Sequence, residues 1–110
     1  MLHTDTRIYR KSLELIRCSA RVIDGLPRGH AHLADQLRRA SSSITLNFAE
    51  GAGKKSARDR LRYFRTAGGS ANEVVAILDV ALAFQAVDKS LHDETVDLAD
   101  HLAAMLARFR

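Results

Sequence analysis

The sequence predicts an all-α protein that folds as an antiparallel, up-down-up-down four-helix bundle. Helix-forming residues dominate the composition, with one Pro and no Trp among 110 residues. Apolar residues recur at spacings of three and four along four segments, which is typical of amphipathic helices. Short connections join these segments and favour antiparallel neighbours. A chain of this length forms one domain with its own core, so we expect a single four-helix-bundle domain over 1–110.

The first helix is expected over about 6–24. Its predicted core stripe consists of Tyr9, Leu13, Ile16, Ala20 and Ile23. Pro27 disfavours a helical conformation at the residue before it, and the glycines on either side loosen the chain. The helix should therefore end before this segment.

The second helix is expected over about 31–50, with a core stripe of Leu33, Leu37, Ala40, Ile44 and Asn47. An Asn among core positions is costly unless its amide is hydrogen-bonded. We therefore expect Asn47 either to fix the register of the helices or to cap a neighbouring turn. Gly51 is the expected C-terminal stop.

The third helix is expected to begin at a capping box, Ser56 to Asp59, and to reach about Ala86. Its stripe is Leu61, Phe64, Ala67, Ala71, Val74, Leu78 and Leu82. Gly68 and Gly69 each cost about 1 kcal/mol in a helix interior. Either a partner helix approaches closely there, or the helix breaks and restarts at a second capping box, Ser70 to Glu73. The stripe keeps its phase across the glycines, which favours a continuous helix.

The fourth helix is expected to begin near Asp88 or Ser90 and to run almost to the C-terminus. Its stripe is Leu91, Thr95, Leu98, Leu102, Met105 and Phe109. The alternating spacing of four and three gives a mean period of 3.5 residues. This period favours left-handed, nearly antiparallel packing of the four helices.

The sequence contains no motif that supports an enzyme, a cofactor or a metal. The segment Gly53 to Ser56 lacks the spacing and the preceding strand of a phosphate-binding loop. Glu-x-x-His pairs of a di-iron bundle are absent, so the histidines, His92 and His101 included, are expected at the surface. The lone Cys18 is expected to be a small residue on a helix surface or seam. We therefore expect a protein that is not an enzyme.

No apolar run approaches the roughly 20 residues that a membrane-spanning helix needs. We therefore expect a soluble, cytoplasmic protein with no membrane partner.

Positive charge is concentrated in the first part of the chain. Residues 1–65 hold 14 Lys or Arg against 6 Asp or Glu, although the net charge of the whole chain is only +4. Such a surface attracts nucleic acid or an acidic protein. The candidate binding residues are Arg38, Arg39, Lys54, Lys55, Arg58, Arg60, Arg62 and Arg65. The alternative is a solvated face, or ion pairs between subunits that involve Asp93, Glu94, Asp97 and Asp100.

A set of residues from Leu33 to Glu73 resembles a known family. They are Leu33, Gln36, Leu37, Arg38, Arg39, Ala40, Ser43, Ile44, Asn47, Ala49, Glu50, Gly51, Ser56, Phe64, Ala67, Gly69, Ser70 and Glu73. The pattern is similar to that of the 23S ribosomal RNA intervening-sequence proteins. That family in turn resembles the accessory variability determinant of diversity-generating retroelements.

The resemblance implies a four-helix bundle that assembles into a basic homopentamer. It also implies binding to nucleic acid and to a reverse transcriptase, with Arg38 and Arg39 as contacts. The alternative within the family is a self-assembling structural bundle without a nucleic-acid role. The resemblance further implies that Gln36, Asn47, Glu50, Ser70 and Glu73 are structural polar groups. At Gly68 the chain departs from the family, which has Arg before the Gly-Ser pair.

Overall fold

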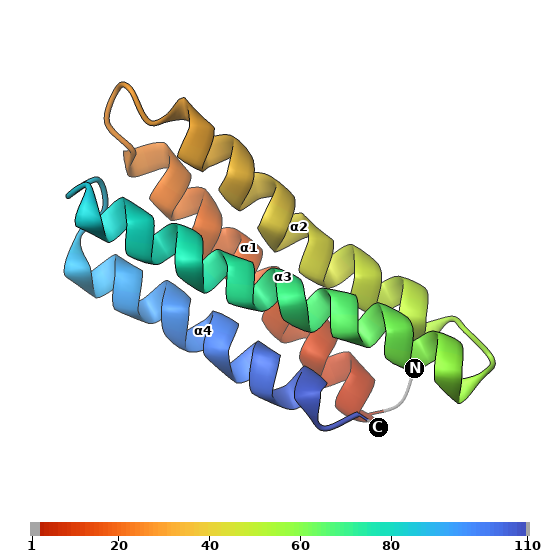
Figure 1. Cartoon of the computed structure of the whole chain (residues 1–110). Coiled ribbons are helices and arrows are strands. Elements are labelled where there is room, and N and C mark those ends of the chain that lie inside the picture. The colour runs from red at the N-terminus through yellow and green to blue at the C-terminus, as the bar shows by residue number, and fades with distance from the viewer. Residues whose placement is uncertain (1–2, 110) are drawn as a thin grey trace.

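The computed structural model describes residues 3–109 and is all-helical over that range. Its four helices are α1 (His3–Gly25), α2 (Ala31–Ala52), α3 (Ala57–Ala83) and α4 (Lys89–Ala107). They lie side by side along one long axis (Figure 1). The four predicted helices are thus confirmed, whereas positions 1, 2 and 110 of the expected domain lie outside the described residues. Within residues 3–109 no helix is long and apolar enough to cross a membrane.

The buried face of α1 differs from the predicted stripe by one position. Ile8, Leu15 and Val22 are almost fully buried, together with Ser12 and Ser19. Four residues of the predicted stripe are only half-buried and Ala20 is exposed, so that prediction was wrong. Apolar periodicity selected the wrong face because two of the core positions hold serine.

A small hydroxyl network explains how these serines are buried between α1 and α2. The Ser41 Oγ donates to the Ser19 Oγ over 2.8 Å, and the Thr45 Oγ1 donates to the Ser12 Oγ over 2.9 Å. Ser12 in turn donates to the carbonyl of Tyr9. Each hydroxyl thus has a partner, which removes most of the cost of taking it out of water.

On α2, Leu33, Leu37, Ala40 and Ile44 are buried as predicted, but the core then continues through Phe48 rather than Asn47. Asn47 is half-buried, and its amide donates to the carbonyl and to the hydroxyl of Ser43. The Ser43 hydroxyl lies 2.8 Å from that of Ser70 on α3. Asn47 therefore orients the serine that links two helices, which agrees with the predicted role in register.

Gly51 does not end α2, contrary to expectation. It lies inside the helix and is buried, and the cap is Gly53. A Cβ at Gly51 would lie 2.8 Å from the Phe64 ring and 2.9 Å from the Tyr63 Cβ. The residue is glycine because α2 and α3 approach each other closely at this point.

Helix α3 is continuous across Gly68 and Gly69, as the phase of the apolar stripe predicted. It begins at Ser56, whose hydroxyl accepts the backbone N–H of Asp59 over 3.1 Å, so the predicted cap is confirmed. It ends at Ala83, before the expected Ala86, because Gln85 adopts a positive φ of 58°. Asp88, one of the two predicted starting points, caps α4 by accepting the Leu91 N–H over 2.8 Å.

The core lies along the common axis of the four helices. Helix α1 contacts α2 and α4, and α3 also contacts α2 and α4. At one end of the core the Phe48 and Phe64 rings stack with centroids 5.0 Å apart, and Phe109 packs on Phe64 at 4.5 Å. Such aromatic pairs add stability beyond their buried area. The aromatic cluster packs together the end of α2 and the start of α3, and residues 54–65 of this region carry six of the eight predicted binding residues.

Candidate nucleic-acid interface

The predicted basic residues from Lys54 to Arg65 lie on the α2–α3 turn and the first turns of α3. Lys55, Arg58, Arg62 and Arg65 are exposed, while Lys54 and Arg60 are half-buried. Within residues 3–109 no carboxylate forms an ion pair with any of the four exposed residues. Their charges are therefore balanced by solvent ions, which a polyanion can displace.

Tyr63 gathers two of the basic side chains. The Lys54 Nζ lies 5.4 Å and the Arg62 Cζ lies 4.9 Å from the centre of the Tyr63 ring, both within the range of cation–π attraction. A Cβ at Gly51 would lie 2.9 Å from the Tyr63 Cβ, so Tyr63 lies at the close approach of α2 and α3. The ring therefore brings Lys54 and Arg62 together on one surface at this point.

Arg60 has a structural role that the sequence did not indicate. Its guanidinium lies 5.6 Å from the Phe64 ring centre and donates to the carbonyl of Ala52, near the end of α2. A cation at a helix C-terminus satisfies carbonyl groups that have no partner within the helix. Of the predicted binding residues in this segment, Arg60 is therefore the one most engaged by its own chain.

Arg38 and Arg39 are not brought together with this cluster. They are exposed on the middle of α2, where Arg38 donates to Asp35 over 3.4 Å. Because Gly51 meets Phe64 while Ser43 meets Ser70, Arg39 and Arg65 lie on opposite sides of the Ser43–Ser70 contact. At 1.5 Å per helical residue, about 14 Å of helix axis separates them. The predicted residues form two basic areas rather than one.

The acidic residues at the start of α4 are engaged within the chain. Glu94 pairs with Arg21 of α1 at 2.6 Å, and the Asp93 carboxylate accepts from Lys89 at 2.7 Å. Two of the four carboxylates considered for contacts between subunits therefore already have partners in their own chain. Cys18 is buried beside Glu94, and burial, with the help of this carboxylate, raises the pKa of its thiol.

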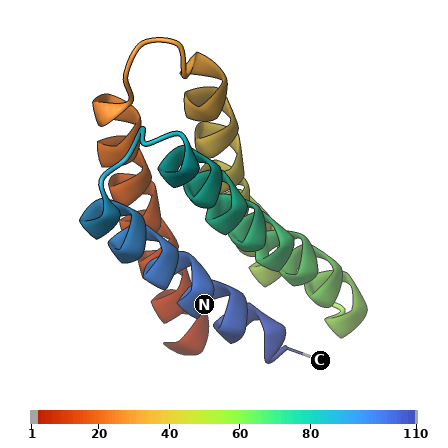
Figure 2. The same ribbon diagram turned by 60° about the vertical axis from the view of Figure 1, so that its left-hand side comes forward.

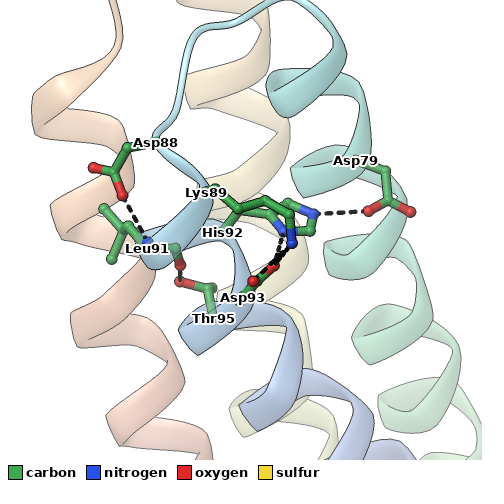
Figure 3. Close-up of polar contacts among 7 residues, drawn as sticks. All are labelled: Asp79, Asp88, Lys89, Leu91, His92, Asp93 and Thr95. Carbon is green, nitrogen blue, oxygen red and sulfur yellow. Dashed lines mark hydrogen bonds and ion pairs between the residues drawn. The ribbon is translucent and has the colours of Figure 1, made fainter.

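His92 is buried rather than on the surface, so that expectation was wrong. Only 7% of the residue is exposed, and its ring bridges two helices, with Nε2 2.9 Å from Asp79 of α3 and Nδ1 2.8 Å from Asp93 (Figure 3). Burial alone lowers the pKa of His92, but the bonds to Asp79 and Asp93 outweigh it and the net pKa is raised. Lys89 and then His92 lower the pKa of Asp93. An imidazolium that donates from both nitrogens matches two carboxylate acceptors.

This histidine escaped sequence reasoning because its partner Asp79 lies on another helix. The sequence did contain a signal for burial. His92 and Asp93 fall within the first turns of the fourth helix, and the apolar face of that helix includes Thr95. Across the described part of the chain, no three His, Cys, Asp or Glu side chains are placed to hold a metal ion. The group formed by His92, Asp79 and Asp93 therefore links α3 to α4 by electrostatic attraction.

Four helices, with exposed basic side chains gathered at one interhelix turn, define a small, basic, all-helical protein. A family model gives a more specific assignment. The chain belongs to the 23S rRNA-intervening sequence protein family, whose model it matches over residues 4–108.

A solved structure has the same fold. It is a crystal structure of a protein with unknown function from the S23 ribosomal protein family of Bacteroides thetaiotaomicron VPI-5482. The two chains are 19% identical and superpose with a TM-score of 0.86, over 94% of this chain and 95% of that one. At this identity the likeness establishes the fold. No curated protein matches the chain.

Proposed function

We propose that this protein is a cytoplasmic, self-assembling binding protein without catalytic activity, and that it holds nucleic acid on the α2–α3 turn and α3. The observation that carries the proposal is the group Lys55, Arg58, Arg62 and Arg65, exposed on a rigid helix start and without a carboxylate partner in residues 3–109. Such an array neutralises successive phosphates whatever the base sequence. We call these four residues the α3 cluster.

The proposed assembly is an antiparallel up-down-up-down bundle that associates as a homopentamer. The antiparallel order is supported by the opposite chain directions of the Gly51–Phe64 and Ser43–Ser70 contacts. Association is supported by large apolar side chains that the single chain leaves exposed, among them Leu46 at 67% and Phe84 at 58%. The number five comes from the family resemblance.

A reverse transcriptase is the proposed protein partner, because the family resembles the accessory proteins of diversity-generating retroelements. The α3 cluster would hold the template or product of such an enzyme, since both are polyanions. Co-purification of this chain with a reverse transcriptase encoded beside it tests this part. If the two proteins elute separately at low salt, the partner is not a reverse transcriptase.

The salt dependence of binding tests the nucleic-acid proposal. Arg58, Arg62 and Arg65 are changed together to Gln, and affinity for an oligouridine RNA is measured over a series of salt concentrations. Loss of three contacts makes the negative slope of log K against log salt shallower by about 2, since each phosphate contributes about −0.7 for a single strand. The matched control changes Arg7, Arg10 and Arg17 of α1, which are also exposed, to Gln. An unchanged slope in the α3 variant would exclude this site.

The alternative is a structural, self-assembling bundle with no nucleic-acid role. It is favoured if Asp97 and Asp100, for which no ion pair is found in residues 3–109, join subunits. Light scattering on Asp97→Asn/Asp100→Asn then reports a smaller mass, and so does the triple Arg variant, because the same ion pairs lose their cations. An intact oligomer in the Asp variant counts against these ion pairs.

A further inference from the structure

A groove of about 610 Å³ lies between α3 and α4, next to the α3 cluster. The two helices run side by side over the length of α4 (Figure 2). Leu61 and Phe109 line this groove together with Gly68 and Gly69, and Arg65 and Asn72 add a guanidinium and an amide. None of the described residues that line the groove carries a carboxylate side chain. The groove thus combines apolar walls with one cation and one amide.

The two glycines are not required by the packing of the chain itself. A Cβ at Gly69 would meet nothing within 4 Å, and one at Gly68 would lie 3.8 Å from the Leu106 Cβ, an ordinary contact. Gly51, in contrast, is forced by a close approach. Two successive glycines destabilise a helix interior, so a reason outside the chain's own packing is needed. Their effect on shape is to leave the groove open and to expose a flat stretch of helix backbone.

The chemistry of the groove suits a flat, polar-edged ring that is attached to a phosphate. Leu61 and Phe109 are half-buried and offer apolar surface for the faces of such a ring. The Asn72 amide supplies both donors and an acceptor for its edge, and the Arg65 guanidinium supplies paired donors for a phosphate. Arg62 and Arg58 continue the line of cations along α3 toward the turn.

We propose that this groove receives an unpaired nucleobase, so that the ligand of the α3 cluster is single-stranded nucleic acid. This inference rests on the proposed function. A strand that follows Arg58, Arg62 and Arg65 by its phosphates passes the mouth of the groove, because Arg65 belongs to both. In a duplex the bases stay stacked inside the double helix, so a duplex contacts only the cations of the α3 cluster. The groove therefore separates single strands from duplexes without reading a sequence.

Filling the groove tests the proposal. Gly69→Leu places a side chain in the open space, and Gly69→Ala is the matched control that removes the glycine but leaves most of the groove free. The probes are an oligouridine RNA, the same length of oligodeoxythymidine, and a blunt RNA duplex. We expect Gly69→Leu to weaken binding of both single strands about fivefold or more, as loss of a stacked base does. Duplex affinity stays unchanged, and Gly69→Ala binds all three probes like the wild type.

Three outcomes would overturn the proposal, and circular dichroism with thermal unfolding first establishes that each variant is folded. If Gly69→Leu and the wild type bind single strands with equal affinity, no base binds in the groove. A lower mass of Gly69→Leu in light scattering assigns the groove to a second copy of the chain. Wild-type protein that binds none of the probes defeats the proposed function itself, whereas wild-type binding with no effect of Gly69→Leu defeats only this inference.

Discussion

Gly51 and Gly69 show that two glycines of the same chain serve opposite purposes. At Gly51 an added methyl group meets the Phe64 ring and the Tyr63 Cβ below 3.0 Å, whereas at Gly69 it meets open space. The sequence marked Gly69 as a position that needs an explanation, but it assigned Gly51 to the end of the second helix. It could not tell them apart, because the difference depends on which helix lies opposite.

Substitution of these glycines by Ala should therefore change stability in opposite directions. Gly69→Ala gains about 1 kcal/mol from helix propensity. Gly51→Ala gains the same but loses about 1–3 kcal/mol to overpacking, so we expect a net loss of about 1 kcal/mol. Urea unfolding followed by circular dichroism measures both. A stabilised Gly51→Ala would contradict the close approach of α2 and α3.

His92 should make stability depend on pH. Its pKa in the folded protein is raised above the ordinary value of 6.5, so the folded state holds its proton more tightly than the unfolded state. Its contribution is complete below about pH 6.5 and is lost as pH rises through the folded-state pKa. Since Asp79 and Asp93 are largely exposed, we expect a contribution on the order of 1 kcal/mol.

The comparison with His92→Gln isolates this effect, because Gln does not titrate. The difference in unfolding free energy between wild type and variant should shrink as pH rises above 6.5. Asp79→Asn is the second variant, and it should reduce the pH dependence while His92 is kept. A difference that stays constant with pH would mean that folding does not change the pKa of His92.

The helices as units were predictable in number and extent, but the inner face of α1 was not. Helix α3 presents seven apolar residues in phase, so periodicity identifies its core side. On α1 the apolar residues form two candidate stripes one position apart. The buried stripe contains Ser12 and Ser19, which pair with hydroxyls of α2. Hydrophobicity alone ranks the face with the two serines below the more apolar face. Hydrogen bonding nevertheless makes the face with the serines the better one to bury.

The hydroxyl contacts between α1 and α2 should be energetically coupled. We expect Ser19→Ala and Ser41→Ala each to cost about 1 kcal/mol, since each leaves the other buried hydroxyl without this partner. The double variant should cost clearly less than the sum of the two. Ser42→Ala is the control, because Ser42 bonds at the exposed side of the same helix and should change stability by less than about 0.5 kcal/mol. Strict additivity in urea unfolding would show that the two hydroxyls do not interact.

For the molecule as a whole, the uneven charge of the sequence becomes two separate basic areas. The α3 cluster lies at the α2–α3 turn, and Arg38 and Arg39 lie about 14 Å further along the helix axis. The sequence identified all these residues as one candidate site. Their separation follows from the pairing of α2 with α3, which residue numbers alone do not specify.

This separation predicts that the effect of Arg38→Gln/Arg39→Gln depends on ligand length. An oligouridine of about four nucleotides carries no more than about four phosphates, so the four cations of the α3 cluster are enough to engage it and it does not need Arg38 or Arg39. The double variant should leave its affinity unchanged and should weaken binding of an oligomer several times longer. Fluorescence anisotropy with both lengths measures this. Equal weakening for both lengths would place the two basic areas in one site.

Local properties of the chain were enough to predict four helices, the cap at Ser56, the continuity of α3 and the basic segment after Gly53. These depend on residues a few positions apart, whose spacing the sequence contains directly. The bridge from His92 to Asp79, the serines between α1 and α2, the contact at Gly51 and the open groove at Gly69 became visible with the packed helices. Each depends on two helices meeting at a particular register, and that register is set by the combined packing of all four helices around the core.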